Sequence, residues 1–148
     1  MNKDERTVLE LINRINKVHN DKYVLRTGDY APVVFMYHHC YYFATMLHEF
    51  YPDSEYYMRK KGRDHVVTRI GDNLYDSSGI ILNVDEYDPF VDQDWAVVEW
   101  DMIPSHKDER ELLKETFEDL VKEVKEIYYP ELLERKGMKK WKIFMLKI

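Results

Sequence analysis

The sequence lacks the features that mark several classes of protein. Its 148 residues include a single cysteine, so no disulfide can form within the chain, and a disulfide-rich secreted module is disfavoured. No apolar run approaches the ~20 residues that a membrane helix requires. The first six residues, MNKDER, lack the apolar stretch of a signal peptide. These absences predict a soluble cytoplasmic protein without a membrane partner.

Basic residues and flexible residues are also scarce. The net charge is −6, and no Lys or Arg occurs from residue 71 to residue 105, where nine acidic residues lie. Because phosphate binding normally needs a basic surplus, this balance argues against a nucleic-acid partner. Five Gly and five Pro stand beside three Trp, twelve Tyr and six Phe, which rules out a disordered chain. A chain of this length can bury its own core, and we expect a single domain over residues 1–148.

Apolar residues recur at three- and four-residue spacing in three segments, which predicts three amphipathic helices. The first runs from about Asp4 to His19, and the last from about Lys107 to Tyr128, followed by a short helix that ends at Arg135. The helix between them starts at Cys40 and ends before Pro52, because proline cannot continue a helix. Residues 20–32 contain turn-forming pairs and are predicted to be a loop.

Runs of alternating apolar and polar residues predict strands between and after the helices. These runs are Glu55–Arg59, His65–Ile70, Asn73–Asp76, Trp95–Trp100 and Trp141–Leu146. The order of elements predicts an α+β fold with an antiparallel sheet of about four or five strands. The cysteine-bearing helix is expected to pack on this sheet, and the N- and C-terminal amphipathic helices to cover a face.

Three residues with chemically useful side chains lie on neighbouring predicted elements. Cys40 opens a helix, where the positive end of the helix dipole favours a thiolate. His65, on a strand, can accept the thiol proton and return it to a leaving group. Asp76, on the paired strand and near the position opposite His65, can hold the imidazole in one orientation. Cys40, His65 and Asp76 are therefore the candidate catalytic residues.

Three short motifs contain these residues: CYYFATMLH from Cys40, DHVVTR from Asp64 and NLYDSSG from Asn73. They resemble the Cys, His, Asp core of transglutaminase-like proteins within the papain-like cysteine peptidase superfamily, over roughly residues 33–80. The resemblance implies a papain-like fold and a thiol-dependent acyl-transfer enzyme with a Cys-His-Asp triad. Its substrate would be an amide bond of a protein or peptide, and its activity that of a peptidase, deamidase or transglutaminase, with no cofactor.

Each of the three residues also has a plainer interpretation. Cys40 can be a small buried hydrophobic residue, and His65 a core histidine with its hydrogen bonds satisfied. Asp76 and the Ser-Ser-Gly that follows it are typical of a turn. A metal site made of Cys40 and nearby histidines is disfavoured. Adjacent His38 and His39 point apart, and His48 lies two helical turns from Cys40.

A second interpretation is a protein with the same fold that catalyses no reaction. The sequence shows no recognisable side chain that would complete an oxyanion hole, and an acidic stretch runs from Asp85 to Asp94. The alternative is therefore a non-catalytic binding or interaction protein that engages a basic partner through its acidic segment. The sequence leaves the oligomeric state open.

Overall fold

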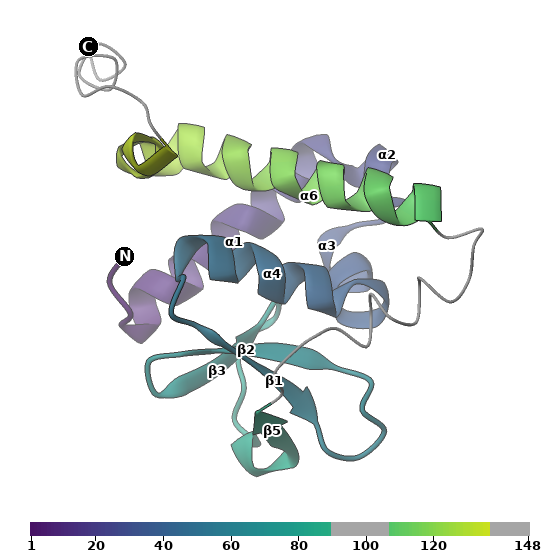
Figure 1. Cartoon of the computed structure of the whole chain (residues 1–148), viewed down its shortest axis with the longest axis vertical. Helices are drawn as coiled ribbons and strands as arrows, with labels where there is room; N and C mark the ends of the chain where they lie inside the picture. The colour runs from purple at the N-terminus through teal and green to yellow at the C-terminus, as the bar shows by residue number, and fades with distance from the viewer. Residues whose placement is uncertain (90–106, 137–148) are drawn as a thin grey trace.

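The computed structural model describes residues 1–89 and 107–136, which form an antiparallel sheet with helices stacked on one side (Figure 1). Helix α4 (Cys40–Phe50) lies against the sheet, and helix α1 (Glu5–Lys22) shares its layer. Helix α6 (Lys107–Tyr128) contacts both helices on the side away from the sheet. The predicted α+β class is confirmed, with the cysteine-bearing helix on the sheet.

The sheet has five strands in the order β4-β3-β2-β1-β5, and each neighbouring pair is antiparallel. The strands are β1 (Glu55–Arg59), β2 (Val66–Ile70), β3 (Asn73–Asp76), β4 (Gly79–Ile80) and β5 (Tyr87–Pro89). The first three confirm the predicted strands within one residue. The edge strands β4 and β5 have two and three residues, which is too short for an alternating pattern to reveal them.

The two long helices follow their apolar stripes. Helix α1 begins after Asp4, whose side chain accepts a hydrogen bond from the backbone N–H of Thr7 at 2.8 Å and so caps the first turn. It continues three residues beyond its predicted end. Helix α6 has its predicted bounds and is followed by the 3-10 helix η4 (Pro130–Lys136).

The predicted loop at residues 20–32 is wrong. This stretch contains the short helices α2 (Val24–Thr27) and α3 (Ala31–Val33), and the π-helix η1 (Val34–His38) then leads to α4. Asn20 Oδ1 accepts a hydrogen bond from the N–H of Ala31 at 2.8 Å, which ties the end of α1 to the start of α3. The proline in α3 does not oppose helix formation, because it lies in the first turn, where its missing N–H would have no acceptor.

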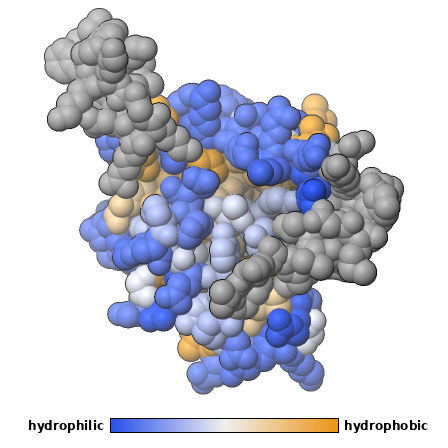
Figure 2. All heavy atoms as spheres, viewed as in Figure 1, coloured by the Kyte–Doolittle hydropathy of each residue, from blue (hydrophilic) through white to orange (hydrophobic). Residues whose placement is uncertain are grey.

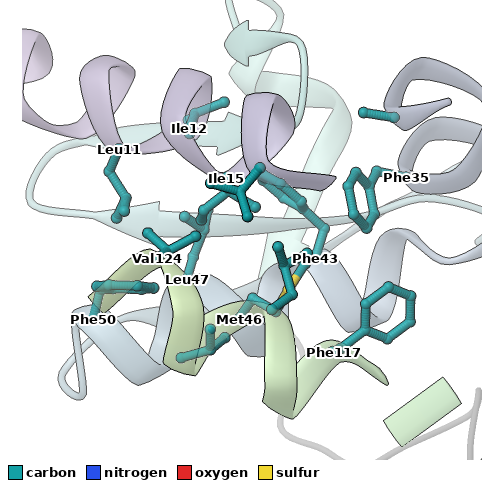
Figure 3. Close-up of a cluster of buried hydrophobic side chains, with 14 of the residues drawn as sticks. Leu11, Ile12, Ile15, Phe35, Phe43, Met46, Leu47, Phe50, Phe117 and Val124 are labelled. Carbon is teal, nitrogen blue, oxygen red and sulfur yellow. The ribbon is translucent and has the colours of Figure 1, made fainter. Parts of the chain in front are cut away.

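Side chains from α1, η1, α4 and α6 meet in one apolar cluster and point toward one another (Figure 3). Its labelled members are at most 3% exposed: Leu11, Ile12, Ile15, Phe35, Phe43, Met46, Leu47, Phe50, Phe117 and Val124. Four of them belong to α4, so this helix is fixed along its length. This packing places the first residue of α4, Cys40, against the sheet.

The remaining fold predictions have different outcomes. The strands predicted at Trp95–Trp100 and Trp141–Leu146 lie outside the described residues, and the single domain over residues 1–148 stays a prediction. In residues 1–89 and 107–136, none of the helices combines the length and apolar character needed to cross a bilayer. The described residues on the face shown in Figure 2 are mainly hydrophilic, with hydrophobic ones in small separate patches.

A matched pair of leucines in α6 tests this packing. Leu120 is 0% exposed and Leu112 is 54% exposed. Leu120→Ala should lower the free energy of unfolding by about 2–5 kcal/mol, because it leaves a cavity in the core. Leu112→Ala should change it by less than about 0.5 kcal/mol. Urea unfolding followed by circular dichroism measures both values, and equal losses would show that the buried face of α6 is assigned wrongly.

Candidate functional site

Cys40 is the first residue of α4 and directly follows the π-helix η1 and His39, whose side chain does not cap α4. Such π-helical turns are rare and occur frequently at functional sites. The cysteine is 9% exposed and packs with Ala44 of its own helix and with Met58 and Val66 of the sheet. The backbone N–H of Val66 points at Cys40 Sγ, with 3.4 Å between nitrogen and sulfur. The sulfur therefore lies at the positive end of a helix and also receives a main-chain donor from β2.

His65 and Asp76 form a buried hydrogen-bonded pair beside this sulfur. His65 Nε2 lies 3.0 Å from Asp76 Oδ2, and the residues are 3% and 5% exposed. The Cys40 sulfur contacts the N–H of Val66, the residue after His65, and the Cys40 side chain is one of the groups that raise the pKa of His65. Since Nε2 faces the carboxylate, Nδ1 is the ring nitrogen left for the sulfur. The structure thus brings the three candidate residues together in the order thiol, imidazole, carboxylate.

The sheet register explains how His65 reaches Asp76. Strands β2 and β3 pair Thr68 with Tyr75, so the next residue of β3, Asp76, comes level with Val67. His65 lies two residues before Val67 and therefore on the same face of the strand. The two side chains are diagonal neighbours, near the opposite positions that the sequence predicted, and diagonal pairs lie within reach of a long or aromatic side chain.

The electrostatic environment favours a charged imidazole. Burial opposes the positive charge of His65, but the hydrogen bond with Asp76 and then the interaction with the Cys40 side chain outweigh it and raise the pKa of His65 to about 9. Burial likewise opposes the negative charge of Asp76, yet the hydrogen bonds from His65 and Ser78 hold the pKa of Asp76 below its usual value. At neutral pH the pair is therefore an imidazolium and a carboxylate.

The turn after β3 holds the second oxygen of the carboxylate. Asp76 Oδ1 accepts hydrogen bonds from the Ser78 backbone N–H at 2.8 Å and from the Ser78 hydroxyl at 2.5 Å. Asn16 of α1 donates from Nδ2 to the carbonyl oxygen of Ser77 at 2.9 Å. Gly79 completes the turn with φ 123°, a value that favours glycine. Asp76 is thus both a turn residue and the partner of His65. The sequence indicated the turn, but gave no signal for Asn16.

Other histidines that the sequence places near Cys40 have separate partners. His48 Nδ1 lies 2.9 Å from the hydroxyl oxygen of Ser54, and the ring of His39 lies 6.0 Å from that of Phe117. Within the described ranges, no group of three or more His, Cys, Asp or Glu side chains has the arrangement of a metal site.

A groove of about 660 Å³ runs between α4 and α6, next to the start of α4. Its lining residues are Tyr41, Tyr42, Thr45, Met46, Glu49, Arg110, Glu111, Lys114, Phe117, Glu118 and Val121. Tyr41, the residue after Cys40, also packs on the cluster that contains the cysteine. The groove therefore adjoins the site through Tyr41, and its lining combines tyrosine rings with charges of both signs.

Comparison with known protein families gives a match. A family model described as Phage YunG-like protein matches residues 11–123, which include all three candidate residues. No curated protein matches the chain. No solved structure matches it.

The family match corrects the resemblance drawn from the three motifs. The matched family is neither a transglutaminase-like nor a papain-like peptidase family, so that assignment is wrong, and the papain-like fold it implied has no support. The match likewise gives no support to an acyl-transfer enzyme with a Cys-His-Asp triad, or to a binding protein that uses an acidic segment. Short motifs with the right order and spacing did not identify the family. The catalytic roles of Cys40, His65 and Asp76 stay predictions.

The buried pair should make stability depend on pH in a defined window. The interactions that raise the pKa of His65 stabilise the folded state fully below pH 6.5, and this contribution is lost as the pH rises to about 9. The lowered pKa of Asp76 stabilises it above about pH 4. Asp76→Asn, which removes the charge, should therefore cost about 3–5 kcal/mol between pH 4 and 6.5, and clearly less at pH 9.5.

Urea unfolding of wild type and Asp76→Asn at pH 5.5, 7.5 and 9.5 measures this difference. Asp72→Asn is the control, because Asp72 is an exposed carboxylate in the turn between β2 and β3. Its effect should stay within about 0.5 kcal/mol at each pH. A difference for Asp76→Asn that is the same at pH 5.5 and pH 9.5 would contradict a charged His65.

Proposed function

The chain belongs to the Phage YunG-like protein family, and we propose that it functions as a reactive-thiol protein, in which Cys40 forms a covalent bond with an electrophilic atom of a second molecule. His65 is the proton partner of the thiol, and Asp76 keeps His65 charged and oriented. The observation that carries the proposal is the buried imidazole of His65, which is hydrogen-bonded to Asp76 while the sulfur of Cys40 contacts the N–H of the next residue, Val66.

Three features of the site stabilise negative charge on the sulfur as it reacts. The imidazolium of His65 supplies a positive charge next to the sulfur, the start of α4 supplies the positive end of a helix dipole, and Val66 supplies an N–H donor. Since the thiolate is the nucleophilic form of cysteine, positive charge and an N–H donor beside the sulfur favour its attack on an electrophile. A structural cysteine needs none of them.

The proposed step is a displacement in which the sulfur forms one bond and the attacked atom loses another. The thiol proton is taken up by the ring of His65 in the reacting form of the site, and the electron pair of the Cys40 sulfur forms the new bond. The bond between the attacked atom and its leaving group breaks, and that group departs with its electron pair. His65 can then supply the proton that the departing group needs.

The proposal concerns the thiol and its two partners, and does not extend to acyl transfer, which the family match leaves without support. A thiol of this kind requires a compartment that keeps it reduced. We therefore propose the cytoplasm as the place where the protein works. A protein or peptide as the molecule that carries the electrophile stays a prediction.

Alkylation by iodoacetamide tests this reactivity directly, since Cys40 is the single cysteine of the chain. The Cys40 sulfur displaces iodide, and mass spectrometry follows the adduct with time. At pH 7 the folded protein should react at least about tenfold faster than the same chain unfolded in urea, because only the folded chain holds the sulfur beside the imidazolium. His65→Asn should lower the rate in the folded protein by about tenfold or more.

The matched control is His48→Asn. His48 belongs to the same helix as Cys40 but is bonded to Ser54, so its loss should leave the alkylation rate within about twofold of wild type. Thermal unfolding of each variant verifies that it is folded at the assay temperature. The proposal is wrong if folded Cys40 reacts no faster than the unfolded thiol, or if His65→Asn leaves the rate unchanged.

A further inference from the structure

We propose that Ser78 is a positioning residue of this site, whose hydroxyl fixes the carboxylate of Asp76 in the orientation that holds His65 against Cys40. This inference rests on the proposed function of Cys40 and adds a residue that touches neither the thiol nor the imidazole. Ser78 acts through Asp76 alone, from the turn between β3 and β4.

The carboxylate needs such a partner because its own torsion is soft. The last side-chain torsion of aspartate has a broad distribution, so one hydrogen bond on one oxygen does not set the carboxylate plane. Asp76 Oδ2 has His65 at 3.0 Å, while Oδ1 accepts both donors of Ser78, at 2.8 Å and 2.5 Å. Because both oxygens are hydrogen-bonded, the plane of the carboxylate is fixed, and so is the orientation of the Oδ2 lone pairs relative to His65.

The hydroxyl of Ser78 also supplies a hydrogen bond to the buried carboxylate from the surface of the protein. Ser78 is exposed, whereas Asp76 is 5% exposed. The shorter of the two bonds to Oδ1 comes from the hydroxyl, and hydrogen bonds to an ionised acceptor are stronger than those between neutral groups. Without the hydroxyl, the backbone N–H of Ser78 would remain on Oδ1 and water would take the vacated place.

The turn itself is anchored independently of this hydroxyl. Asn16 of α1 holds the carbonyl of Ser77, and the positive φ of Gly79 closes the turn. Ser78 donors also contribute to the lowered pKa of Asp76, after the hydrogen bond with His65. Loss of the Ser78 hydroxyl should therefore weaken the hold on the carboxylate while the backbone around it stays in place.

Ser77 and Ser78 offer a matched comparison of adjacent serines. The Ser77 hydroxyl is buried and has no hydrogen-bond partner among the described residues, so Ser77→Ala removes a hydroxyl without removing a bond. Ser78→Ala removes the bond to Oδ1. A second pair, Ser78→Thr and Ser78→Val, has nearly the same shape and differs in the hydroxyl, and makes the same comparison if Ser78→Ala does not fold.

The readouts are the iodoacetamide rate at pH 7 and the NMR signal of the His65 ring N–H in protein labelled with ¹⁵N-histidine. Ser78→Ala and Ser78→Val should alkylate about three- to tenfold more slowly than wild type. Their His65 Nε2–H signal should shift upfield and exchange faster with water, because the hydrogen bond to Asp76 is less well aligned. Ser77→Ala and Ser78→Thr should match wild type in both readouts.

The outcomes separate this inference from the proposed function. If folded Ser78→Ala or Ser78→Val gives the wild-type rate and the wild-type His65 signal, Ser78 does not position Asp76. If Ser77→Ala changes both readouts as much as Ser78→Ala, the effect belongs to the turn and the inference is likewise overturned. If Cys40 of the wild type is unreactive while the His65 signal still responds to Ser78→Ala, the proposed function fails and the positioning of the carboxylate stands.

Discussion

The hydrogen bond between His65 and Asp76 is the contact on which the rest of the site depends. Both groups are buried, and removal of either one would leave the other as an unpaired charge in an apolar setting, at a cost of several kcal/mol. The pair can exist in the interior because each charge satisfies the other, with the sulfur of Cys40 and the donors of Ser78 on the remaining positions. The same charge that must be compensated for stability is the one that can activate the thiol.

Much of the fold could be predicted from the sequence, because most of its helices and strands have a local pattern of apolar residues. Helices α1, α4 and α6 follow apolar stripes, and β1 to β3 follow alternation with a turn signal between β2 and β3. The edge strands β4 and β5 are too short to carry a pattern, and their places depend on pairing with residues far along the chain. The stretch after α1 was missed for another reason. Its Gly and Pro residues indicate breaks, but they lie at the ends of short helices, where both residues are tolerated.

The candidate site was predictable in its placement and not in its detail. The sequence puts Cys40 at a helix start and His65 and Asp76 on neighbouring strands. The structure has Cys40 at the start of α4 and Asp76 at the end of β3, and His65 directly before β2. The diagonal register, the Val66 donor and the anchor from Asn16 depend on how the sheet and α1 pack, which no local motif encodes. Family and reaction did not follow from the three motifs either. A fold and a set of side chains can host unrelated functions. The match to the Phage YunG-like family shows that the transglutaminase-like assignment suggested by the motifs is wrong.

The central claim is that a charged imidazole lies between a thiol and a carboxylate in the folded protein. An NMR titration of the His65 ring nitrogens, assigned by comparison with His65→Asn, measures that charge directly. Both ring nitrogens should stay protonated through neutral pH, and the ring should lose one of its two N–H protons near pH 9. A titration midpoint at or below the ordinary histidine value of 6.5 would show that His65 is neutral beside Cys40, and would contradict the account.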